Sequence, residues 1–384
     1  MNVERAHGDG PRRGGILIAG GGTAGHVLPG LAVAAALVER GVVADRSDVH
    51  LVGSRRGVEV ELVPGAGFGL TVLGGRGIQR RLTPANVGAL TGLLAGFLRA
   101  FLLMVRARPR VVLSLGGYAS IPCGLAAVVL RVPLVVAEQN AVPGAANRLL
   151  GRFARASAVS FVDTALPRPE LTGNPVRAAI RSAVGTRSEA RARIGVDDRP
   201  LLVAFGGSLG ARRINRAVAD FVEGWRGGPL AVRHVVGARG WAAGEMARAV
   251  PAGVGYTAVA YEHDMPTLLA AADLVVCRSG ATSVAELAVL GVPSVLVPLP
   301  GAPGDHQTAN ARHLAGSGGA VLLADADLDG SALEDLLGEI LSDPPRRDAM
   351  AEAARSMARP DAADRVVDLI LRHAAGRCDD VRDA

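Results

Sequence analysis

Short, continuous apolar runs recur along this 384-residue chain, and longer stretches with helical periodicity separate them. Runs of four or five apolar residues without polar alternation are typical of strands buried on both faces of a parallel sheet. Helices between such strands form right-handed crossovers and cover both faces of the sheet. The pattern therefore predicts doubly wound α/β domains. The expected strands are residues 15–19, 49–52, 111–115, 134–137, 158–161, 201–205, 232–236, 256–259, 274–277, 294–297 and 320–323.

The chain is long enough for two such domains of about 150–200 residues each. Pro167, Pro169, Gly173 and Pro175 come close together near the middle of the chain. This combination predicts a break without regular structure between the two halves. Each half has its own set of apolar runs, so each can form its own hydrophobic core.

The charge pattern limits the choice of partner. Every basic residue is an arginine, and the absence of lysine excludes a Schiff-base lysine or the lysine of a P-loop. The net charge of +6 favours nucleic acid, an anionic membrane or a phosphorylated substrate. Aromatic residues make up only 3% of the chain, which argues against the stacking platforms that bind single-stranded nucleic acid. We therefore expect no nucleic-acid partner.

Cysteine use and hydropathy point to the cytoplasm. Cys123, Cys277 and Cys378 are too few and too scattered for a disulfide framework or a zinc cluster. Residues 1–14 are polar, unlike a secretory signal peptide. No uninterrupted apolar stretch approaches the ~18 residues of a membrane-spanning helix. We expect a cytoplasmic protein that can touch a membrane surface.

The most informative segment runs from Gly280 to Glu286, between the expected strand at 274–277 and a helical pattern at 285–290. Small and hydroxyl residues at such a junction leave backbone N–H groups open to an anion. These residues are Ala281, Thr282, Ser283, Val284 and Ala285. A bare phosphate site has little use for the carboxylate of Glu286, whereas a ribose diol can donate hydrogen bonds to it. The segment therefore predicts a nucleotide-sugar site.

A second glycine-rich turn, residues 20–26, follows the first expected strand. Gly20, Gly22 and Gly25 fit the dinucleotide-binding pattern. Such a site also needs an acidic residue at the end of the second strand, where this chain has Gly53 and Ser54. A nicotinamide cofactor is therefore disfavoured.

His26 comes directly after these glycines, where a side chain can face a ligand. Imidazole titrates near neutral pH and is a natural general base. Alternatively, His26 is a histidine in the first turn of a helix that only hydrogen-bonds a backbone group. The sequence leaves both interpretations open.

Polar residues also follow other expected strands, where ligands bind in open α/β sheets. Asn140 is a candidate for a sugar hydroxyl because an amide both donates and accepts hydrogen bonds. Glu138 and Gln139 beside it could instead form a helix cap or a loop network. Ser208, in another strand–glycine–helix junction, could donate to a phosphate, and Gln307 could reach a sugar or lie at a solvated helix start.

Asp325 and Asp327 have the spacing of a D-x-D metal motif. Their acidic neighbourhood is more simply a loop that caps the helix from Ser331. A helix N-terminus can carry the charge of a diphosphate without a metal. We therefore expect no metal and no cofactor.

A basic loop and a helical apolar stripe lie between residues 76 and 108. An apolar helix face beside a basic loop can rest on anionic lipid. The alternative is a core helix of the first domain, because most amphipathic stripes face a core. The membrane interpretation and the core interpretation are both correct if only the loop and one end of the helix contact lipid. The residues expected to meet a membrane are Arg76, Arg80, Arg81, Leu90, Leu94 and Phe97.

The order and spacing of the motifs resemble the MurG family of peptidoglycan N-acetylglucosaminyltransferases, which have the GT-B fold. The matching segments are residues 20–26 (GGGTAGH), 116–118 (GGY), 138–140 (EQN), 173–177 (GNPVR), 206–211 (GGSLGA), 277–281 (CRSGA) and 305–307 (DHQ). The resemblance implies two Rossmann-like domains that face each other across a cleft. The acceptor- and membrane-facing domain would cover residues 14–173 and the donor domain 174–356, with a C-terminal helix at about 357–376 packing back on the first.

The resemblance also implies a reaction. N-acetylglucosamine would move, with inversion, from UDP-N-acetylglucosamine to the muramyl 4-hydroxyl of the undecaprenyl-linked pentapeptide acceptor, lipid I, to give lipid II. The enzyme would be peripheral, on the cytoplasmic face of the cell membrane, with cell-wall and division proteins as possible further partners.

The resemblance implies a role for individual residues, with His26 as the base and Glu286 on the ribose. Glu262 stands where the family often has an apolar residue whose backbone meets the uracil, and His306 stands where many members have Gln. The donor-binding positions would be Thr23, Ala24, Gly25, Asn140, Arg177, Ser208, Glu262, Ala281, Thr282, Ser283, Val284, Ala285, Glu286 and Gln307. The acceptor-side positions would be Gly21, Gly22, Gly116, Gly117 and Tyr118.

Two rival functions stay open at this stage. One is another enzyme of the same fold, either a UDP-sugar transferase with a different lipid or small-molecule acceptor or a sugar-nucleotide epimerase. The other is a catalytically silent, lipid-binding scaffold. The intact His26, Ser208 and Glu286 argue against the scaffold.

Overall fold

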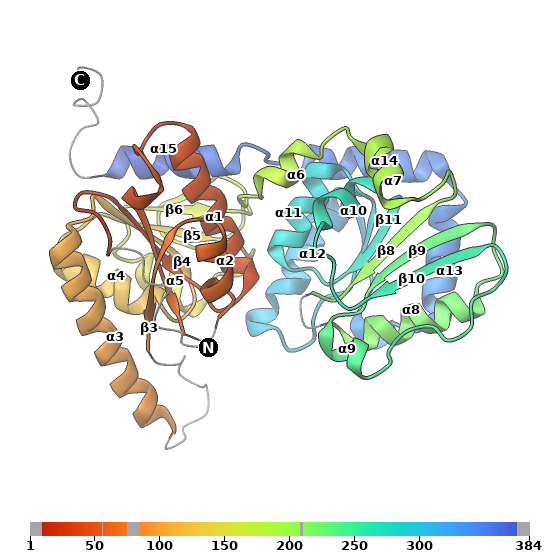
Figure 1. Ribbon diagram of the computed structural model, residues 1–384, viewed down its shortest axis with the longest axis horizontal. Helices are drawn as coiled ribbons and strands as arrows, with labels where there is room; N and C mark the ends of the chain where they lie inside the picture. Colours follow the sequence, from red (N-terminus) through yellow and green to blue (C-terminus); the bar gives the residue numbers. More distant parts are fainter. Residues whose placement is uncertain (1–9, 56, 75–84, 208–209, 375–384) are drawn as a thin grey trace. The chain divides into compact units, whose positions relative to one another are not determined.

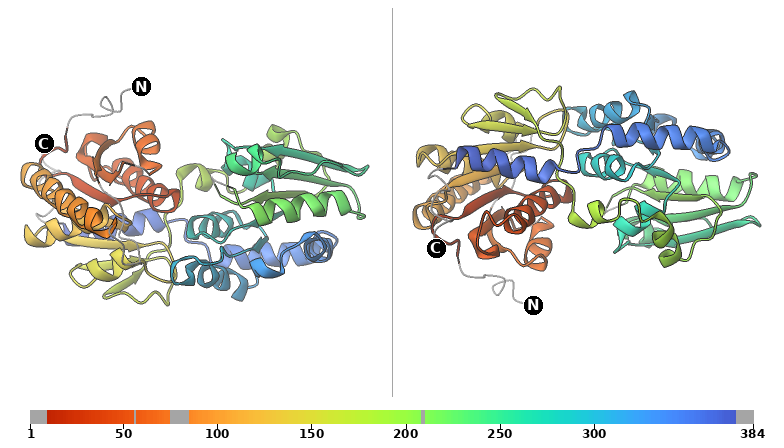
Figure 2. Two further views of the ribbon diagram at one scale, coloured as in Figure 1. Left: turned by 90° about the horizontal axis from the view of Figure 1, so that it is seen from below. Right: turned by 90° about the horizontal axis from the view of Figure 1, so that it is seen from above.

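The computed structural model describes residues 10–55, 57–74, 85–207 and 210–374, without the side chains of 85–90. Within these residues the chain forms two compact units. Unit 1 runs to Arg177 and resumes at Arg359, and unit 2 spans Ala178–Ala358. Each unit contains a parallel sheet with helices on both faces (Figures 1 and 2). The prediction of two doubly wound α/β domains is confirmed.

In unit 1 the described strands are ordered β3-β2-β1-β4-β5-β6-β7, and every neighbouring pair is parallel. The order reverses direction between β1 and β4, and such switch points are where ligands bind open α/β sheets. The strands are β1 (Ile16–Gly20), β2 (Val49–Ser54), β3 (Gly69–Leu73), β4 (Val111–Gly116), β5 (Leu134–Glu138), β6 (Ala156–Val159) and β7 (Pro169–Leu171).

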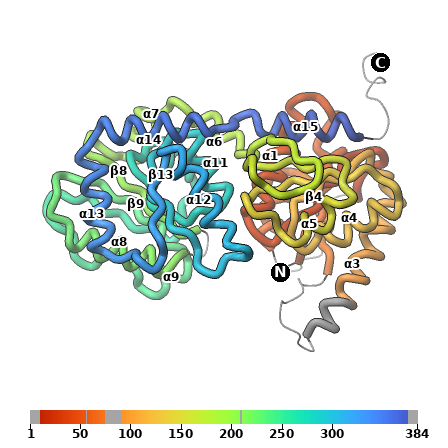
Figure 3. Tube along the Cα trace, turned by 180° about the vertical axis from the view of Figure 1, so that it is seen from behind, coloured from red at the N-terminus to blue at the C-terminus, as the bar shows by residue number. Residues whose placement is uncertain are grey.

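Two apolar layers cover the sheet of unit 1, because successive strand residues point to opposite faces. Ile16 and Ile18 of β1 pack with α1, α2 and α15, while Leu17 and Ala19 pack with α3 and α4. The helices of unit 1 are α1 (Ala24–Glu39), η2 (Arg46–Asp48), α2 (Glu59–Gly65), α3 (Ala85–Ala107), α4 (Ser120–Val129), α5 (Ala145–Leu150) and α15 (Ala362–His373). Helix α15 contacts α1 and β5. Figure 3 shows α15 in blue, close to the C-terminal end of the described chain.

Unit 2 repeats the plan with the strand order β10-β9-β8-β11-β12-β13, which places a switch point between β8 and β11. The strands are β8 (Leu201–Phe205), β9 (Leu230–Val235), β10 (Val254–Val259), β11 (Leu274–Cys277), β12 (Ser294–Leu296) and β13 (Ala320–Leu322). The helices are α6 (Ala178–Ser182), α7 (Arg187–Ile194), α8 (Arg212–Gly224), α9 (Ala238–Ala242), α10 (Met265–Ala271), α11 (Ala281–Leu290), η3 (Pro303–Asp305), α12 (His306–Gly316), η4 (Asp325–Asp327), α13 (Gly330–Leu341) and α14 (Pro344–Ser356).

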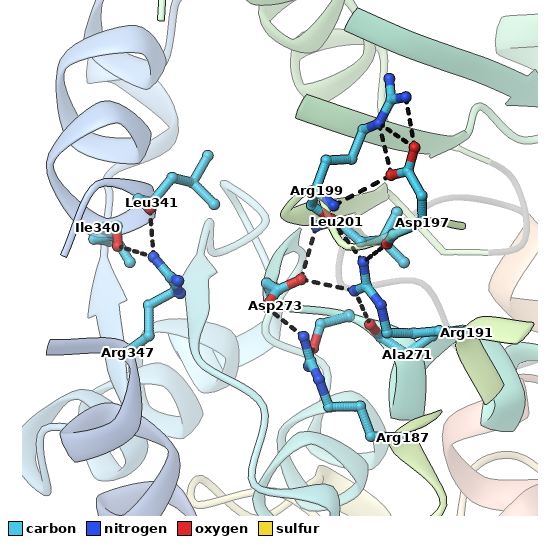
Figure 4. Close-up of polar contacts among 11 residues, drawn as sticks. Arg187, Arg191, Asp197, Arg199, Leu201, Ala271, Asp273, Ile340, Leu341 and Arg347 are labelled. Atoms are coloured by element: carbon cyan, nitrogen blue, oxygen red, sulfur yellow. Dashed lines mark hydrogen bonds and ion pairs between the residues drawn. The ribbon is translucent and has the colours of Figure 1, made fainter. Parts of the chain in front are cut away.

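A carboxylate fastens α7 to the sheet of unit 2. Asp273 accepts hydrogen bonds from Arg187, from Arg191 Nη1 at 3.0 Å and from the Leu201 N–H at 2.8 Å (Figure 4). Arg191 also donates to the carbonyl of Arg199 at 2.6 Å. These bonds join α7, the start of β8 and the residue that precedes β11.

Besides β9 and β10, which each begin two residues earlier than expected, three strand expectations need correction. The sequence pattern missed β3, because Gly69–Leu73 begins with glycine and includes a polar threonine. The sixth strand lies at Ala156–Val159, two residues before the expected 158–161. The segment expected to be irregular contains β7, which pairs with β6 at the edge of the sheet. Pro169 is its first residue, a position where a strand tolerates a missing N–H.

Candidate active site

In unit 1 the loops that follow β1 and β4 meet at the switch point. A Cβ atom on Gly117, whose φ is +80°, would lie 2.4 Å from the carbonyl oxygen of Gly21. Only glycine therefore allows these two loops to approach so closely. Ser120 Oγ lies 2.8 Å from the carbonyl oxygen of Ala19 and 2.7 Å from that of Gly116, so it links the ends of both strands.

This junction places His26 in the first turn of α1. Thr23 precedes the helix in an extended conformation, and its carbonyl accepts the N–H of His26 at 3.1 Å. The Thr23 hydroxyl lies 3.2 Å from His26 Nδ1. His26 Nε2 lies 3.4 Å from the place where a Cβ on Gly116 would be, so this nitrogen faces the β4 loop. In the tautomer that carries its proton on Nδ1 and donates it to Thr23, Nε2 is the nitrogen that can accept a proton.

Glu138, the last residue of β5, organises the next loop of unit 1. Its buried carboxylate accepts hydrogen bonds from the Asn140 N–H at 3.0 Å, the Gly144 N–H at 3.0 Å and Asn147 Nδ2 at 2.8 Å. Asn140 Nδ2 also lies 3.2 Å from this carboxylate. Glu138 therefore forms the loop network that the sequence left as an alternative. Asn147, a buried polar residue on the short helix α5, was not predicted from the sequence.

The hydroxyl of Tyr118 does not point to the junction of the loops after β1 and β4. It lies 2.9 Å from the carbonyl oxygens of both Gly74 and Gly92, and it can donate to either. Burial raises the pKa of the Tyr118 hydroxyl. Tyr118 therefore joins the end of β3 to α3 through its hydroxyl, and only its backbone belongs to the β4 loop.

In unit 2, α11 begins directly after the β11 loop. Gly280 precedes the helix, and the first intrahelical hydrogen bond runs from the Val284 N–H to the Gly280 carbonyl at 3.0 Å. The N–H groups of the three residues before Val284 therefore point out of the helix end. Among the described residues, the buried Thr282 hydroxyl oxygen has no hydrogen-bond partner. Glu286, only 6% exposed, lies one turn further along the same helix.

Buried hydrogen bonds join the β11 loop to the start of α12. Ser279 Oγ donates to the carbonyl of Gln307 at 2.8 Å, and Asn310 Nδ2 donates to the carbonyl of Ser279 at 3.1 Å. The Leu299 N–H donates to Gln307 Oε1 at 3.0 Å, which orients the Gln307 amide. Ser279 and Asn310, both fully buried, were not singled out from the sequence. Ser279 lies next to Arg278, and Asn310 lies among the polar residues of 306–313, so neither stands out in the sequence.

Glu262 follows β10 and is bound within unit 2. Its Oε2 accepts from Arg233 Nη2 at 2.8 Å, and its Oε1 accepts the Asp264 N–H at 3.1 Å. Burial alone would raise the pKa of Glu262, but the hydrogen bonds from Arg233 and from backbone N–H groups outweigh it and hold the pKa below its usual value. Glu262, which stands where the family often has an apolar residue, is therefore paired with Arg233 of the neighbouring strand β9.

Asp325 of the D-x-D sequence faces an arginine. Its Oδ1 accepts from Arg278 Nη1 at 2.6 Å, and the same nitrogen donates to the carbonyls of Val297 and Pro298 at 3.2 and 2.9 Å. This contact ties η4 to the ends of β11 and β12. Nearby, Asp329 caps α13 by accepting the Ala332 N–H, as an acidic capping loop predicts.

Some expected site residues lie outside the described part of the chain, namely Ser208, Arg76, Arg80 and Arg81, as does the side chain of Leu90. A cavity of about 280 Å³ lies against the face of β8, β9 and β10, with Arg199 and Arg233 in its lining. The lining includes Arg233, the partner of Glu262, and Arg199 and Leu201, whose backbone groups take part in the Asp273 and Arg191 contacts. The cavity lies along the strands rather than at their carboxyl ends.

Comparison with known proteins identifies the family. Residues 16–159 match the N-terminal domain of glycosyltransferase family 28, and residues 201–366 match its C-terminal domain. The chain belongs to glycosyltransferase family 28. The matches fall on both units, with the loops described above after β1, β4, β5 and β11 inside them. The glycosyltransferase expected from the motifs is thereby confirmed.

Relatives within family 28 cover nearly the whole chain. One is the UDP-N-acetylglucosamine–N-acetylmuramyl-(pentapeptide) pyrophosphoryl-undecaprenol N-acetylglucosamine transferase of Desulforudis audaxviator, 40% identical over 370 residues that cover 92% of this chain and 97% of the relative. The enzyme of the same name from Alkalilimnicola ehrlichii is 41% identical over 366 residues, with 94% and 99% coverage.

Solved structures agree with this assignment. The crystal structure of Acinetobacter baumannii MurG has a TM-score of 0.74 and 29% identity, and covers 94% of this chain and 100% of that chain. A UDP-GlcNAc 2-epimerase from Neisseria meningitidis bound to UDP-GlcNAc has a TM-score of 0.65 at 12% identity, covering 93% of this chain and 99% of that one, and shares the fold only. The MurG-type glycosyltransferase of GT-B fold expected from the motifs is therefore confirmed.

Proposed function

We propose that this enzyme transfers N-acetylglucosamine from UDP-N-acetylglucosamine to lipid I and so makes lipid II for the cell wall. The observation that carries the proposal is the 40% identity to transferases of this reaction over nearly the full length of both chains. The polar groups at both switch points fit the same chemistry.

Unit 2 would bind the donor. The first-turn N–H groups of α11 would bind the diphosphate, and the unpartnered Thr282 hydroxyl beside them can donate to it. Glu286 would accept from the ribose hydroxyls, and the Gln307 amide, oriented through its Oε1, would offer its NH2 group to the sugar. Arg177 and Ser208 would add donors for the phosphates. No step in this scheme needs a metal, because helix dipole and N–H groups stabilise the leaving charge.

Unit 1 would supply the base and the acceptor site. His26 Nε2 would take the proton of the muramyl 4-hydroxyl as that oxygen attacks the anomeric carbon. The bond from this carbon to the β-phosphate oxygen breaks, UDP leaves, and the configuration inverts. Thr23, Ala24, Gly25 and Asn140 would lie near the transferred sugar, and the glycines at 21, 22, 116 and 117 would face the acceptor.

We further propose that α3 rests on the cytoplasmic face of the membrane, near cell-wall and division proteins. Within the described residues, no helix is long and apolar enough to cross a bilayer. Leu94, Leu98 and Leu102 follow one another at four-residue spacing and are 61%, 53% and 54% exposed. Phe97 and Phe101 instead pack on the core of unit 1, so Phe97 serves the fold and the leucine stripe is the part offered to lipid.

The proposal is tested by UDP release from UDP-N-acetylglucosamine with and without a lipid I analogue. We expect release that requires the lipid, and a loss of about 10²–10⁴-fold in His26→Ala, the usual worth of a general base. The affinity for UDP, measured by calorimetry, should be equal in both proteins. Release that ignores the lipid would contradict the proposed reaction, and equal turnover in His26→Ala would remove His26 as the base.

A further inference from the structure

A buried carboxylate supports the glycine-rich turn of unit 1 from inside the protein. Glu59, the first residue of α2, is only 1% exposed. We propose that Glu59 is a positioning residue that fixes the turn carrying Thr23 and His26. The inference rests on the proposed role of His26 and extends it to a residue that would touch neither substrate.

The hydrogen bonds of Glu59 connect two strand ends. The Gly22 N–H lies 3.1 and 3.0 Å from the two carboxylate oxygens. The Ser54 N–H and Oγ both donate to Oε1, at 2.6 and 2.8 Å. Hydrogen bonds to a charged group are worth about twice those between neutral groups. Glu59 therefore holds the turn after β1 against the end of β2.

The chain around Glu59 is shaped to admit this carboxylate. A Cβ atom on Gly21 would lie 2.2 Å from Glu59 Oε1, and one on Gly57 would lie 1.9 Å from Oε2. Neither position accepts a side chain without displacing the carboxylate. The glycines at these positions thus serve the approach of Glu59, in addition to any contact with a ligand.

This arrangement changes what the glycine-rich turn can do. The Gly22 N–H already donates to Glu59, so it is not presented to a phosphate as in a dinucleotide site. The turn instead has a fixed shape before substrate arrives. It continues directly into Thr23, whose hydroxyl contacts His26 Nδ1.

The test is the kinetics of Glu59→Gln, which keeps the length of the side chain but replaces one acceptor oxygen by a donor. Glu61→Gln, on the exposed side of the same helix, is the matched control. We expect kcat to fall roughly 10- to 100-fold in Glu59→Gln, because misplacing a reacting group by 1 Å can cost about 10²-fold. The affinity for UDP should stay within about twofold, since all the groups proposed to bind UDP except Arg177 are in unit 2.

A double-mutant cycle separates positioning from general damage. Once His26 is removed, holding it in place has no value, so Glu59→Gln should cost less than about threefold in a His26→Ala background. Ser54→Ala, which removes one donor and leaves the backbone intact, should show the same coupling with a smaller loss, and it serves if Glu59→Gln does not fold.

Three results would overturn the inference. They are a kcat for both Glu59→Gln and Ser54→Ala within twofold of wild type, losses that multiply in the His26→Ala background, or a parallel fall in UDP affinity. Wild-type turnover is measured first. If wild-type turnover is absent, the proposed function fails and this inference fails with it. If the wild type is active and Glu59→Gln and Ser54→Ala are unaffected, only the role of Glu59 is refuted.

Discussion

The contact between Thr23 and His26 gives a prediction of defined size. Thr23→Val keeps the shape and the β-branch of the side chain but removes the hydroxyl 3.2 Å from His26 Nδ1. A net hydrogen bond is worth about 0.5–1.5 kcal/mol, and 3.2 Å is at the long end of the usual range, so we take about 0.5–1 kcal/mol. Each 1.36 kcal/mol is tenfold in rate, which predicts a kcat lower by about 2- to 5-fold.

The assay is steady-state UDP release with a lipid I analogue at saturating donor. Thr23→Ser is the control, because it retains the hydroxyl and should retain most of the rate. The Thr23 carbonyl, which accepts the His26 N–H, is unchanged in both variants. Full activity of Thr23→Val, or an equal loss in Thr23→Ser, would refute the argument that the hydroxyl orients the imidazole.

Other parts of the structure give further predictions. Gly117→Ala should lower the free energy of unfolding, measured with denaturant, by about 1–3 kcal/mol. The reason is that the φ of Gly117 is +80° and the added Cβ would clash with the carbonyl oxygen of Gly21. Burial lowers the pKa of His50 and of His234 to about 4, so below pH 6.5 the unfolded chain binds protons that the folded chain does not. Stability should therefore fall between pH 7 and pH 5 by about 2 kcal/mol for each, and replacing either histidine with Gln should remove its share. Leu98→Asp should weaken co-sedimentation of the protein with anionic vesicles several-fold, whereas Val129→Asp on α4, where the side chain is also more than half exposed, should not. Equal effects of the two substitutions would contradict the lipid-facing role of α3.

The sequence predicted the strands best where they are central. The run 274–277 coincides with β11 and the run 201–205 with β8, because strands covered on both faces need continuous apolar residues. Edge strands show the continuous apolar run less clearly, because they have a neighbouring strand on one side only. The short β7, which starts at Pro169, shows how little apolar sequence such a strand requires.

For the site, the sequence located the loops but not their supports. The glycine-rich turns and the start of α11 could be predicted as ligand-binding loops, because clusters of glycine and small residues directly after a strand are typical of such loops. Glu59 was not, because its importance arises from Gly21 and Gly57 closing around it, which only tertiary contacts reveal. Tyr118 shows the reverse case, in which a residue at the expected position turns its hydroxyl toward the fold.

The most direct test of the account is the identity of the product. Purified protein would be incubated with UDP-N-acetylglucosamine, labelled in the sugar, and a lipid I analogue, and the lipid fraction analysed by NMR and mass spectrometry. The account predicts one N-acetylglucosamine joined to the muramyl 4-hydroxyl in the β configuration, because the α-linked donor reacts by a single inverting displacement. An α-linked product, attachment at another hydroxyl, or conversion of the donor to its epimer without lipid would contradict it.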